Sequence, residues 1–388
     1  MLVRTDLNVP IENGVVTDAS RIESHVQTLR ELAGRGGRVI VLSHLGRPKG
    51  KVVPSLSLKP VAAALAKSLG QRVRFAEDCV GPKAKSAVDK MRDGDVLLLE
   101  NTRFHTGEEQ GNEAFAKEVA QLGDLFVNDA FSVAHRDHAT TTTLAYELPS
   151  AAGRAMQSEL SHLHATLDDP ERPLMAVVGG AKVSGKIGIL ENLVKRVETL
   201  AIGGAMANTL LSAQGREIGR SLCERDMAGT ARQLLALAGE QNCRVILPED
   251  AVVASELAPG VATREVAIDI VPQDTMILDI GTRTVASIGA ALDEARTLVW
   301  NGPLGAFEIA PFDRGTVALA KRVAELTQAG KLLSVAGGGD TVAALAAAGV
   351  IGELSYVSTA GGAFLEWLEG RELPGVAALS DPSQGAEK

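Results

Sequence analysis

Short apolar runs rich in Val, Ile and Leu alternate with longer segments of helical character along this 388-residue chain. This alternation is typical of β-α-β units, in which parallel strands form a sheet that helices cover. The chain is too long for one ordinary core, so about two domains are expected. The pattern therefore predicts an α/β fold with two doubly wound, Rossmann-like parallel-sheet domains joined by a hinge helix.

The connection between the two halves is expected near residue 160. Leu160, Leu163 and Leu167 recur at helical spacing, and DDPERP (168–173) follows with two prolines that end the helix. We predict a first domain at 1–153, an interdomain helix and hinge at 154–170, and a second domain at 171–370. Gly153, just before the helix, is a candidate hinge residue.

In the first half, each apolar run leads directly into polar residues. The runs are Leu2–Val3, Val39–Leu42, Val96–Leu99 and Leu125–Val127. The residues that follow them are Arg4, Asp6 and Asn8, then Ser43, His44 and Arg47, then Glu100, Asn101 and Arg103, and finally Asn128 and Asp129. Ligands of parallel sheets bind outside the carboxyl ends of the strands, so these side chains are expected to converge on one crevice.

Several cationic side chains belong to this predicted crevice. His44 and Arg47 lie in SHLGRP (43–48), Arg103 lies in ENTRFH (100–105), and Arg136 lies in AHRDH (134–138). Arginine forks bind carboxylate and phosphate with two parallel hydrogen bonds, so several at one sheet edge indicate a small polyanion as ligand. Any single one would more often be a surface ion pair. Arg21, in the first turn of a helix that starts near Ser20, is positioned to look into the same crevice.

In the second half, glycines follow the apolar runs. Leu174–Val178 leads to GGAKVSGK (179–186), Ala201–Ile202 to GGAM (203–206), Met276–Ile280 to Gly281, Thr297–Trp300 to NGPLGAFE (301–308), Leu332–Ala336 to GGGDT (337–341), and Tyr356–Thr359 to AGGA (360–363). A strand followed by glycines and a helix start aims free backbone N–H groups at an anion. One such pair is usually only a turn, but this number predicts a phosphate-binding edge.

The loop GGAKVSGK almost matches a P-loop. Gly180, Gly185 and Lys186 occupy the required positions, but Ile187 stands where a true P-loop has the Ser or Thr that binds magnesium. Lys182 and Lys186 are still well placed for phosphates, and the alternative is that both are solvated surface lysines.

Asp340 in GGGDT is the candidate magnesium ligand, because a carboxylate beside a phosphate-binding loop suits that ion. Its other interpretation is an N-cap at the start of a helix, and both can hold. Asn301 and Glu308 flank a Pro-containing segment as candidate phosphate and ribose contacts, or the segment is merely a turn.

Charge and cysteine content narrow the class further. The first 153 residues carry 19 Lys and Arg against 19 Asp and Glu, whereas the remainder carries 20 against 29, for a net charge of −9. An acidic chain disfavours nucleic acid as a partner. Cys79, Cys223 and Cys243 form no C-x-x-C pair and are expected to be reduced. The sequence shows neither an apolar run long enough for a membrane span nor a signal peptide, so we expect a cytoplasmic protein without membrane partners.

Taken in register, the motifs resemble the phosphoglycerate kinase family over essentially the whole chain. They run from RTDLNVP (4–10) through SHLGRP, LLLENTRFH (97–105), NDAF (128–131), AHR, GGAK, WNGPLGAFE, GGGDT and STAGGA to LEGRELPGV (368–376). The resemblance implies a monomer that transfers the acyl phosphate of 1,3-bisphosphoglycerate to Mg-ADP, giving 3-phosphoglycerate and ATP. It also implies that the C-terminal segment, 371–388, returns to the first domain.

The resemblance implies the following site residues. The glycerate ligand would be held by Asp6, Asn8, Arg21, His44, Arg47, Arg103 and Arg136, of which the last three would grip the phosphate that is not transferred. Arg21 and Lys182 would stabilise charge on the migrating phosphoryl group. The nucleotide would be bound by Lys182, Lys186, Gly203, Gly204, Leu278, Asn301, Glu308, Gly337, Gly338, Gly339, Asp340, Thr341, Gly361 and Gly362, with Asp340 as the Mg²⁺ ligand.

One position departs from the family pattern, and two other classes of protein compete. Ala360 stands where the family has the first of three glycines, which would shift one N–H donor. A P-loop-type ATPase is the enzyme alternative, and Ile187 argues against it. A nucleotide-binding protein without catalysis is the other, and the presence of Arg21, Lys182 and Asp340 argues against that.

Overall fold

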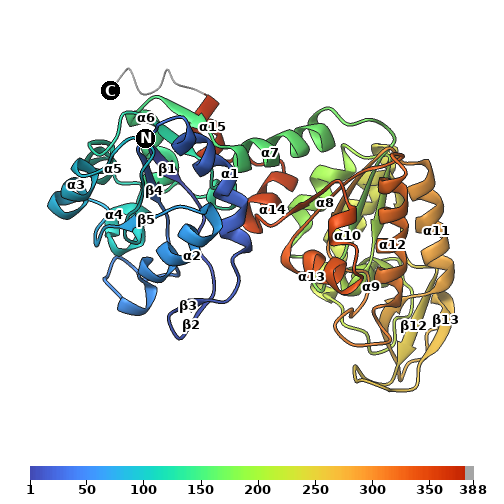
Figure 1. Cartoon of the computed structure of the whole chain (residues 1–388). Coiled ribbons are helices and arrows are strands. Elements are labelled where there is room, and N and C mark those ends of the chain that lie inside the picture. Colours follow the sequence, from blue (N-terminus) through green and yellow to red (C-terminus); the bar gives the residue numbers. More distant parts are fainter. Residues whose placement is uncertain (381–388) are drawn as a thin grey trace. The chain divides into compact units, whose positions relative to one another are not determined.

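The computed structural model describes residues 1–380, and they form two compact units. Unit 1 comprises Met1–Leu160 together with the segment from Glu372, and unit 2 is Ser161–Arg371 (Figure 1). Each unit is built on a six-stranded parallel sheet, so the predicted α/β class with two such sheets is confirmed.

The sheet of unit 1 has the strand order β5-β6-β4-β1-β7-β8. Its strands are β1 (Leu2–Arg4), β4 (Val39–Leu42), β5 (Val73–Phe75), β6 (Val96–Leu98), β7 (Phe126–Asn128) and β8 (Ser150–Ala152). A separate hairpin pairs β2 (Ile11–Glu12) with β3 (Val15–Val16). β1 lies at the centre, where Leu2 is paired with Ile40 on one side and Phe126 on the other.

Helices cover both faces of this sheet. They are α1 (Ser20–Gly34), α2 (Lys59–Leu69), α3 (Gly81–Asp89), α4 (Thr106–Glu109), α5 (Glu113–Ala120), α6 (Leu144–Glu147) and α15 (Pro374–Ser380). The helix α7 (Arg154–Leu163) carries the chain from unit 1 into unit 2. Successive strand residues point to opposite faces, so Val3 and Val41 pack with α1 and α2, while Leu2 and Phe126 pack in the core that includes α5 and α15. Burial on both faces explains why these strands read as continuous apolar runs.

The main sheet of unit 2 has the order β11-β10-β9-β15-β16-β17. Its strands are β9 (Leu174–Val178), β10 (Thr199–Ile202), β11 (Arg244–Ile246), β15 (Thr297–Asn301), β16 (Leu333–Gly337) and β17 (Tyr356–Ser358). Its helices are α8 (Ile187–Val194), α9 (Gly204–Ala213), α10 (Ala228–Glu240), α11 (Thr282–Glu294), α12 (Arg314–Gln328), α13 (Gly339–Ala347) and α14 (Gly362–Leu368). Trp300 of β15 is buried in the core formed with α11, α12 and α13.

One predicted strand lies in a different place from the one expected. Met276–Ile280 is β14, but it belongs to a three-stranded antiparallel sheet with β12 (Asp250–Ala254) and β13 (Arg264–Ala267). Gly281, which follows it, therefore does not join the expected phosphate-binding edge. A Cβ on Gly281 would lie 2.3 Å from Cγ of Asp250, so this glycine is required by packing against that carboxyl group.

The predicted helix around 159–167 is present. α7 starts at Arg154 and continues as a π-helical turn over His164–Asp168, ahead of Pro170 and Pro173. Among residues 1–380, none of the helices is long and apolar enough to cross a membrane.

The end of the described chain packs in unit 1. The backbone N–H of Gly375 donates to the carbonyl oxygen of Ala134 at 2.8 Å, and Asn128 Nδ2 donates to the carbonyl oxygen of Gly375 at 3.4 Å. The returning C-terminal segment was predicted as 371–388, and its residues 381–388 lie outside the described residues.

Gly375 gives a test of how tightly this segment packs. A Cβ there would lie 2.9 Å from Cγ2 of Thr141 and 3.0 Å from Cα of Ala134, so Gly375→Ala should lower the free energy of unfolding by about 1–3 kcal/mol. Urea denaturation followed by circular dichroism measures the change. Gly352→Ala, where a Cβ meets open space, is the matched control, and equal stabilities of the two variants would contradict the prediction.

Candidate functional site

The loop after β1 in unit 1 is organised around the carboxylate of Asp6. Arg21 Nη1 donates to Asp6 Oδ2 at 2.8 Å, Ser132 Oγ donates to the same oxygen at 2.5 Å, and the N–H of Asn8 donates to Oδ1 at 3.0 Å. Asp6 is only 4% exposed. Burial alone would raise the pKa of Asp6, but the Coulombic effect of His44 in its protonated form, the Arg21 guanidinium and the Ser132 hydroxyl outweigh burial and hold that pKa at about 2.

Arg21 combines a fixed position with access to ligand. It lies in the first turn of α1, and its link to Asp6 holds one guanidinium nitrogen while 42% of the side chain stays exposed. Asn8 has a related role, because its Oδ1 accepts from the N–H of Gly46 at 2.9 Å and so joins the loop after β1 to the loop after β4. Both predicted residues lie at the carboxyl end of the sheet.

His44 at the end of β4 is buried against Arg4. Arg4 Nη2 donates to His44 Nδ1 at 3.2 Å, so Nδ1 is the acceptor nitrogen and Nε2 carries the proton of the neutral ring. Burial and the adjacent Arg4 guanidinium hold the pKa of His44 well below its usual value. His44 can therefore donate a hydrogen bond to a ligand but does not carry a charge at neutral pH.

Positive charge is concentrated around Arg103. This side chain is 2% exposed; its Nη1 donates to the carbonyl oxygen of Gly46 at 2.8 Å, while Nη2 makes no hydrogen bond within residues 1–380. Burial, with Arg4 and Arg136 nearby, lowers the pKa of Arg103 to about 10, and burial and the same cations lower the pKa of His138 to about 3. A buried donor left open among like charges indicates an anion site.

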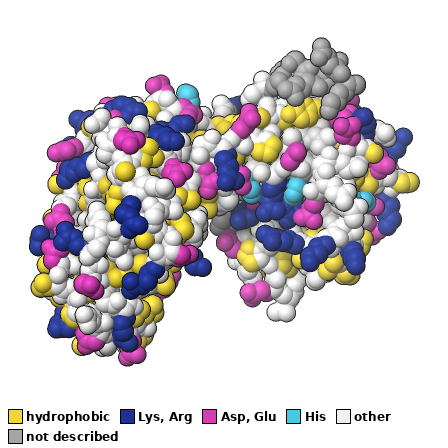
Figure 2. All heavy atoms as spheres, turned by 180° about the vertical axis from the view of Figure 1, so that it is seen from behind, with side chains coloured by type: hydrophobic (Ala, Val, Ile, Leu, Met, Phe, Trp, Pro, Cys, Tyr) yellow, Lys and Arg dark blue, Asp and Glu magenta, His cyan; other side chains and the backbone are white. Residues whose placement is uncertain are grey.

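The other two predicted arginines differ in exposure. Arg47 is exposed, and Arg136 is half-buried with its Nε 3.4 Å from Nε2 of His135. On the face of unit 1 that Figure 2 draws, Lys and Arg side chains gather beside histidines. The four arginines predicted from the sequence thus include one buried, two half-buried and one exposed residue.

Two residues support this site although the sequence assigned them no role in ligand binding. Arg4 is fully buried, and its Nε donates to Thr140 Oγ1 at 3.0 Å, which in turn donates to the buried Glu108 at 2.6 Å. The only available signal was the position of Arg4 at the end of the first strand. His25, a buried residue of α1, is the second.

His25 links three parts of unit 1. Its Nε2 accepts from the backbone N–H of Asp6 at 3.0 Å, so Nδ1 carries the proton and donates to Asp129 Oδ2 at 2.8 Å. Asp129 Oδ1 then accepts from the N–H of Ala155 at 2.9 Å, at the start of α7. A Cβ on Gly153 would lie 2.1 Å from that oxygen, so glycine is required for this contact.

In unit 2, the glycine loops pack against one another. A Cβ on Gly179 would lie 1.9 Å from the carbonyl oxygen of Pro303, one on Gly203 would lie 2.3 Å from Leu304 Cδ2, and one on Gly204 would lie 2.6 Å from the carbonyl oxygen of Gly180. These glycines are therefore required by the contact between the loops after β9, β10 and β15. Their backbone N–H groups donate to carbonyl oxygens: Gly203 to Val178 and Gly204 to Leu304.

The two predicted lysines lie in different environments. Lys182 is exposed in the loop after β9. Lys186 is partly buried, and its Nζ donates to the carbonyl oxygen of Gly179 at 2.7 Å and to that of Asn301 at 3.2 Å. Burial lowers the pKa of Lys186 to about 8, although the carboxylate of Asp340 acts in the opposite direction.

Asn301 and Thr341 fix the ends of β15 and β16. Asn301 Nδ2 donates to the carbonyl oxygen of Gly337 at 2.7 Å, and Thr341 Oγ1 accepts from the N–H of Gly302 at 2.7 Å. Trp300 Nε1 donates to the carbonyl oxygen of Gly302 at 2.8 Å. Asn301 Oδ1 is buried and has no hydrogen-bond partner in the described chain, which leaves one acceptor at this edge open.

The loops after β16 and β17 turn through glycines with positive φ. Gly338 (φ 98°) precedes α13 and Gly361 (φ 56°) precedes α14, while Gly339 and Gly361 face open space. Asp340 is exposed in the first turn of α13, one residue past the start of that helix, so the N-cap is Gly338 and not Asp340. Ala360 is buried, and its N–H donates to Ser358 Oγ at 3.2 Å.

The remaining predicted nucleotide contacts are Leu278, Glu308, Gly337 and Gly362. Leu278 is a buried residue of β14 whose carbonyl oxygen accepts from the N–H of Ala306 at 2.8 Å, which ties the antiparallel sheet to the loop after β15. Glu308 is exposed in that loop. Gly337 ends β16, and Gly362 is the first residue of α14.

Cationic side chains at the strand ends of one α/β unit, and glycine-rich strand ends with a lysine and an aspartate in the other, are the features expected of the class of two-domain kinases. The family model described as Phosphoglycerate kinase matches residues 1–371, and the chain belongs to that family. Members catalyse the reversible transfer of a phosphoryl group from 1,3-bisphosphoglycerate to ADP in glycolysis, and this chain is a kinase of that kind.

Relatives support the assignment over nearly the whole chain. The phosphoglycerate kinase of Methylorubrum extorquens is 61% identical over 379 residues, which are 98% of this chain and 95% of that protein. The phosphoglycerate kinase of Sinorhizobium fredii is 57% identical with the same coverage. The solved structure of phosphoglycerate kinase from Coxiella burnetii has a TM-score of 0.92 at 43% identity and covers 98% of this chain and 95% of its own.

The role of His25 can be tested through stability. His25→Leu removes the donor to Asp129 and the acceptor for the N–H of Asp6, so it should lower the free energy of unfolding by about 3 kcal/mol. Urea denaturation checks this value. His164→Ala, at an exposed histidine, should change stability by less than about 0.5 kcal/mol, and a similarly small effect at His25 would refute the linking role.

Proposed function

We propose that unit 1 binds 3-phosphoglycerate or 1,3-bisphosphoglycerate through a cation cluster, which consists of Arg47, Arg103 and Arg136. We further propose that the glycine-rich edge of unit 2 binds ADP or ATP. The open Nη2 of the buried Arg103 carries the first half of this proposal, since a phosphate oxygen is the acceptor that such a donor lacks. The phosphoryl group then passes directly between the two ligands.

In the proposed function, the polar groups of unit 1 have different roles. Arg47, Arg103 and Arg136 bind the phosphate that is not transferred, and the neutral His44 donates to the ligand through Nε2. Asp6 and Asn8 hold the loop and accept hydrogen bonds from the hydroxyl of the glycerate. Arg21, exposed and fixed by Asp6, neutralises charge on the phosphoryl group as it moves.

In unit 2, we assign the phosphates of the nucleotide to Lys182, Lys186, Asn301 and Thr341, together with free N–H groups around Gly338, Gly339, Gly361 and Gly362. Gly337 allows β16 to end against Asn301, Glu308 contacts the ribose, and Leu278 with Gly203 and Gly204 borders the adenine. The exposed Lys182 shares the migrating phosphoryl group with Arg21.

Asp340 fits a magnesium ion. Its carboxylate is exposed beside the glycine turn, and Mg²⁺ is commonly held by one or two carboxylates plus the phosphates of the substrate. When bound, the ion neutralises negative charge on the nucleotide phosphates. Lys186 lies near enough to Asp340 for its pKa to be affected, so cationic and anionic groups are both available at this edge.

The phosphoryl transfer requires the two ligands to be aligned and the charge of the phosphoryl group to be neutralised. It requires no general acid or base. An acyl phosphate already has a good leaving group, and in-line transfer requires the acceptor oxygen to be brought to the phosphorus with water excluded. We therefore propose that the two ligands meet only when the units close during turnover. The proposal includes a cytoplasmic monomer, and light scattering of the purified chain tests the oligomeric state.

A coupled assay for ATP consumption that depends on 3-phosphoglycerate tests the proposed function directly. Turnover is expected with Mg²⁺ and should stop when the ion is chelated. Absence of turnover with all three components present would overturn the proposal. Persistent ATP hydrolysis by Lys182→Ala without 3-phosphoglycerate would instead favour a P-loop-type ATPase.

Arg21 is expected to act mainly in the transition state. Arg21→Ala should lower kcat by about 10²–10³-fold with a much smaller change in KM, because its contact strengthens as charge develops on the phosphoryl group. Steady-state kinetics separate the two constants. Arg35→Ala, an exposed arginine next to the end of the same helix, is the matched control. A large rise in KM at unchanged kcat would contradict the role.

The lowered pKa of Lys186 predicts that the protein takes up protons when the nucleotide binds. With a pKa of about 8 the amine is about half deprotonated at pH 8, and a phosphate placed beside it favours the charged form, so binding of ADP should take up roughly half a proton. Calorimetry in buffers of different ionisation enthalpy measures this uptake. Lys186→Arg, which stays charged, should abolish it, and uptake that is equal in both proteins would rule out Lys186 as its source.

A further inference from the structure

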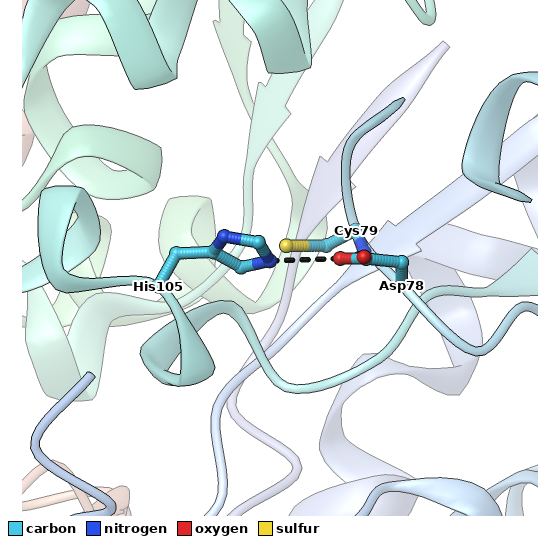
Figure 3. Close-up of side chains that lie close together, drawn as sticks. All are labelled: Asp78, Cys79 and His105. Carbon is cyan, nitrogen blue, oxygen red and sulfur yellow. Dashed lines mark hydrogen bonds and ion pairs between the residues drawn. The ribbon is translucent and has the colours of Figure 1, made fainter. Parts of the chain in front are cut away.

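A cluster of three potential metal ligands lies in unit 1, apart from the residues assigned above. Asp78 and Cys79 follow β5, and His105 follows a 3₁₀ turn, Thr102–Phe104. One ligand atom from each residue lies within 4.8 Å of the other two. Figure 3 shows the imidazole, the thiol and the carboxylate converging on one place, with His105 Nε2 2.7 Å from Asp78 Oδ1.

The surroundings hold the three groups in place and leave one side open. The ring of His105 stacks on Phe115 with centroids 5.2 Å apart, and Asp78 Oδ1 also accepts from the N–H of Cys79 at 2.8 Å. Cys79 is fully buried and is a free thiol, whereas the side chains of His105 and Asp78 are 33% and 37% exposed. An ion could therefore enter from solvent between the histidine and the aspartate.

We propose that Asp78, Cys79 and His105 bind a divalent cation of the zinc type, with water as the fourth ligand. Imidazole nitrogen, thiolate sulfur and carboxylate oxygen are the donors that Zn²⁺ takes in tetrahedral sites. Donor atoms around tetrahedral Zn²⁺ lie about 3.3–3.8 Å apart, so the contact between His105 and Asp78 must widen while the sulfur moves closer by up to about 1 Å. The thiol proton leaves to solvent, and His105 binds as the neutral imidazole through Nε2 with its one ring proton on Nδ1.

This site differs in chemistry from the magnesium site assigned to Asp340. Mg²⁺ prefers oxygen ligands and avoids sulfur, so it should not compete at Cys79. The simpler interpretation of the cluster is an ion pair between His105 and Asp78 with a buried cysteine nearby. The two interpretations differ in the expected response to a thiophilic cation: a metal site binds the cation, whereas the ion pair with a nearby cysteine does not.

A bound cation would also join two loops of unit 1. His105 comes two residues after Arg103, whose guanidinium belongs to the cation cluster. A ligand set from both loops would tie this turn to the segment between β5 and α3. Cation binding should therefore raise the melting temperature of the protein.

The test uses the full-length protein stripped of metal and titrated with Zn²⁺ by calorimetry, and with Cd²⁺ followed by the ultraviolet absorption of the cadmium–thiolate bond. One equivalent should bind, with a rise in melting temperature. Cys79→Ser and His105→Gln should each weaken binding at least about tenfold, and Cys79→Ser should remove the cadmium–thiolate band.

Cys223→Ser is the matched control, because Cys223 is a more accessible cysteine that belongs to no such cluster within residues 1–380. It should leave Zn²⁺ affinity unchanged. Circular dichroism of Cys79→Ser and His105→Gln verifies that each is folded, and kinase activity without Zn²⁺ provides a second check. Failure of the unmodified protein to bind Zn²⁺, or equal binding by all three variants, would overturn the proposal.

Discussion

The hydrogen bonds to the carboxylate of Asp129 are the interactions on which the candidate site of unit 1 depends. One oxygen accepts from His25, and the other accepts from the N–H groups of Ala155 and Met156. His25 in turn accepts a hydrogen bond from the backbone N–H of Asp6. A substitution at any of these positions therefore disturbs the hydrogen bonds of the others. Since Asp129 is fully buried, an uncompensated charge there would be costly, and the surrounding donors are needed for the fold as well as for the site.

The two units use different means to build a site at the same kind of sheet edge. Unit 1 supplies cationic side chains, several of them buried near one another, and burial together with the repulsion between these cations lowers the pKa values of Arg103 and His138. Unit 2 supplies the backbone of its glycine-rich loops, and hydrogen bonds from Lys186 and Asn301 hold the ends of these loops together. Under the proposed function an anionic ligand would relieve the repulsion in unit 1, whereas the loops of unit 2 are complete as packed backbone.

Much of the fold follows from the sequence because strands buried on both faces read as uninterrupted apolar runs. Short strands such as Val73–Phe75 and Ser150–Ala152 were missed, because three-residue strands without a fully buried residue do not stand out from neighbouring loops. Met276–Ile280 was correctly predicted as a strand and given the wrong sheet, since an apolar run does not reveal the direction of its partners. The antiparallel pairing of β12 and β14 depends on contacts far apart in sequence.

The candidate site, like the fold, has features that the sequence predicts and features that it does not. Arginines after strands could be found by position, and the structure brings Arg103 and His44 to the predicted edge. The roles of Arg4 and His25 could not be found, because they depend on which side chains are buried together. The glycines of unit 2 were predicted from their possible ligand, yet Gly179, Gly203 and Gly204 are already required by contacts between loops. Glycine after a strand thus has two physical causes that sequence alone does not separate.

The indole of Trp300 provides an optical reporter for the nucleotide edge. The chain has two tryptophans, Trp300 and Trp367, and both belong to unit 2. Trp300 is buried at the end of β15 and is hydrogen-bonded to the carbonyl oxygen of Gly302, in the loop that also contacts Thr341. Both tryptophan fluorophores therefore report from unit 2, and the unfolding of unit 1 is better followed by probes that do not depend on tryptophan, such as Tyr146.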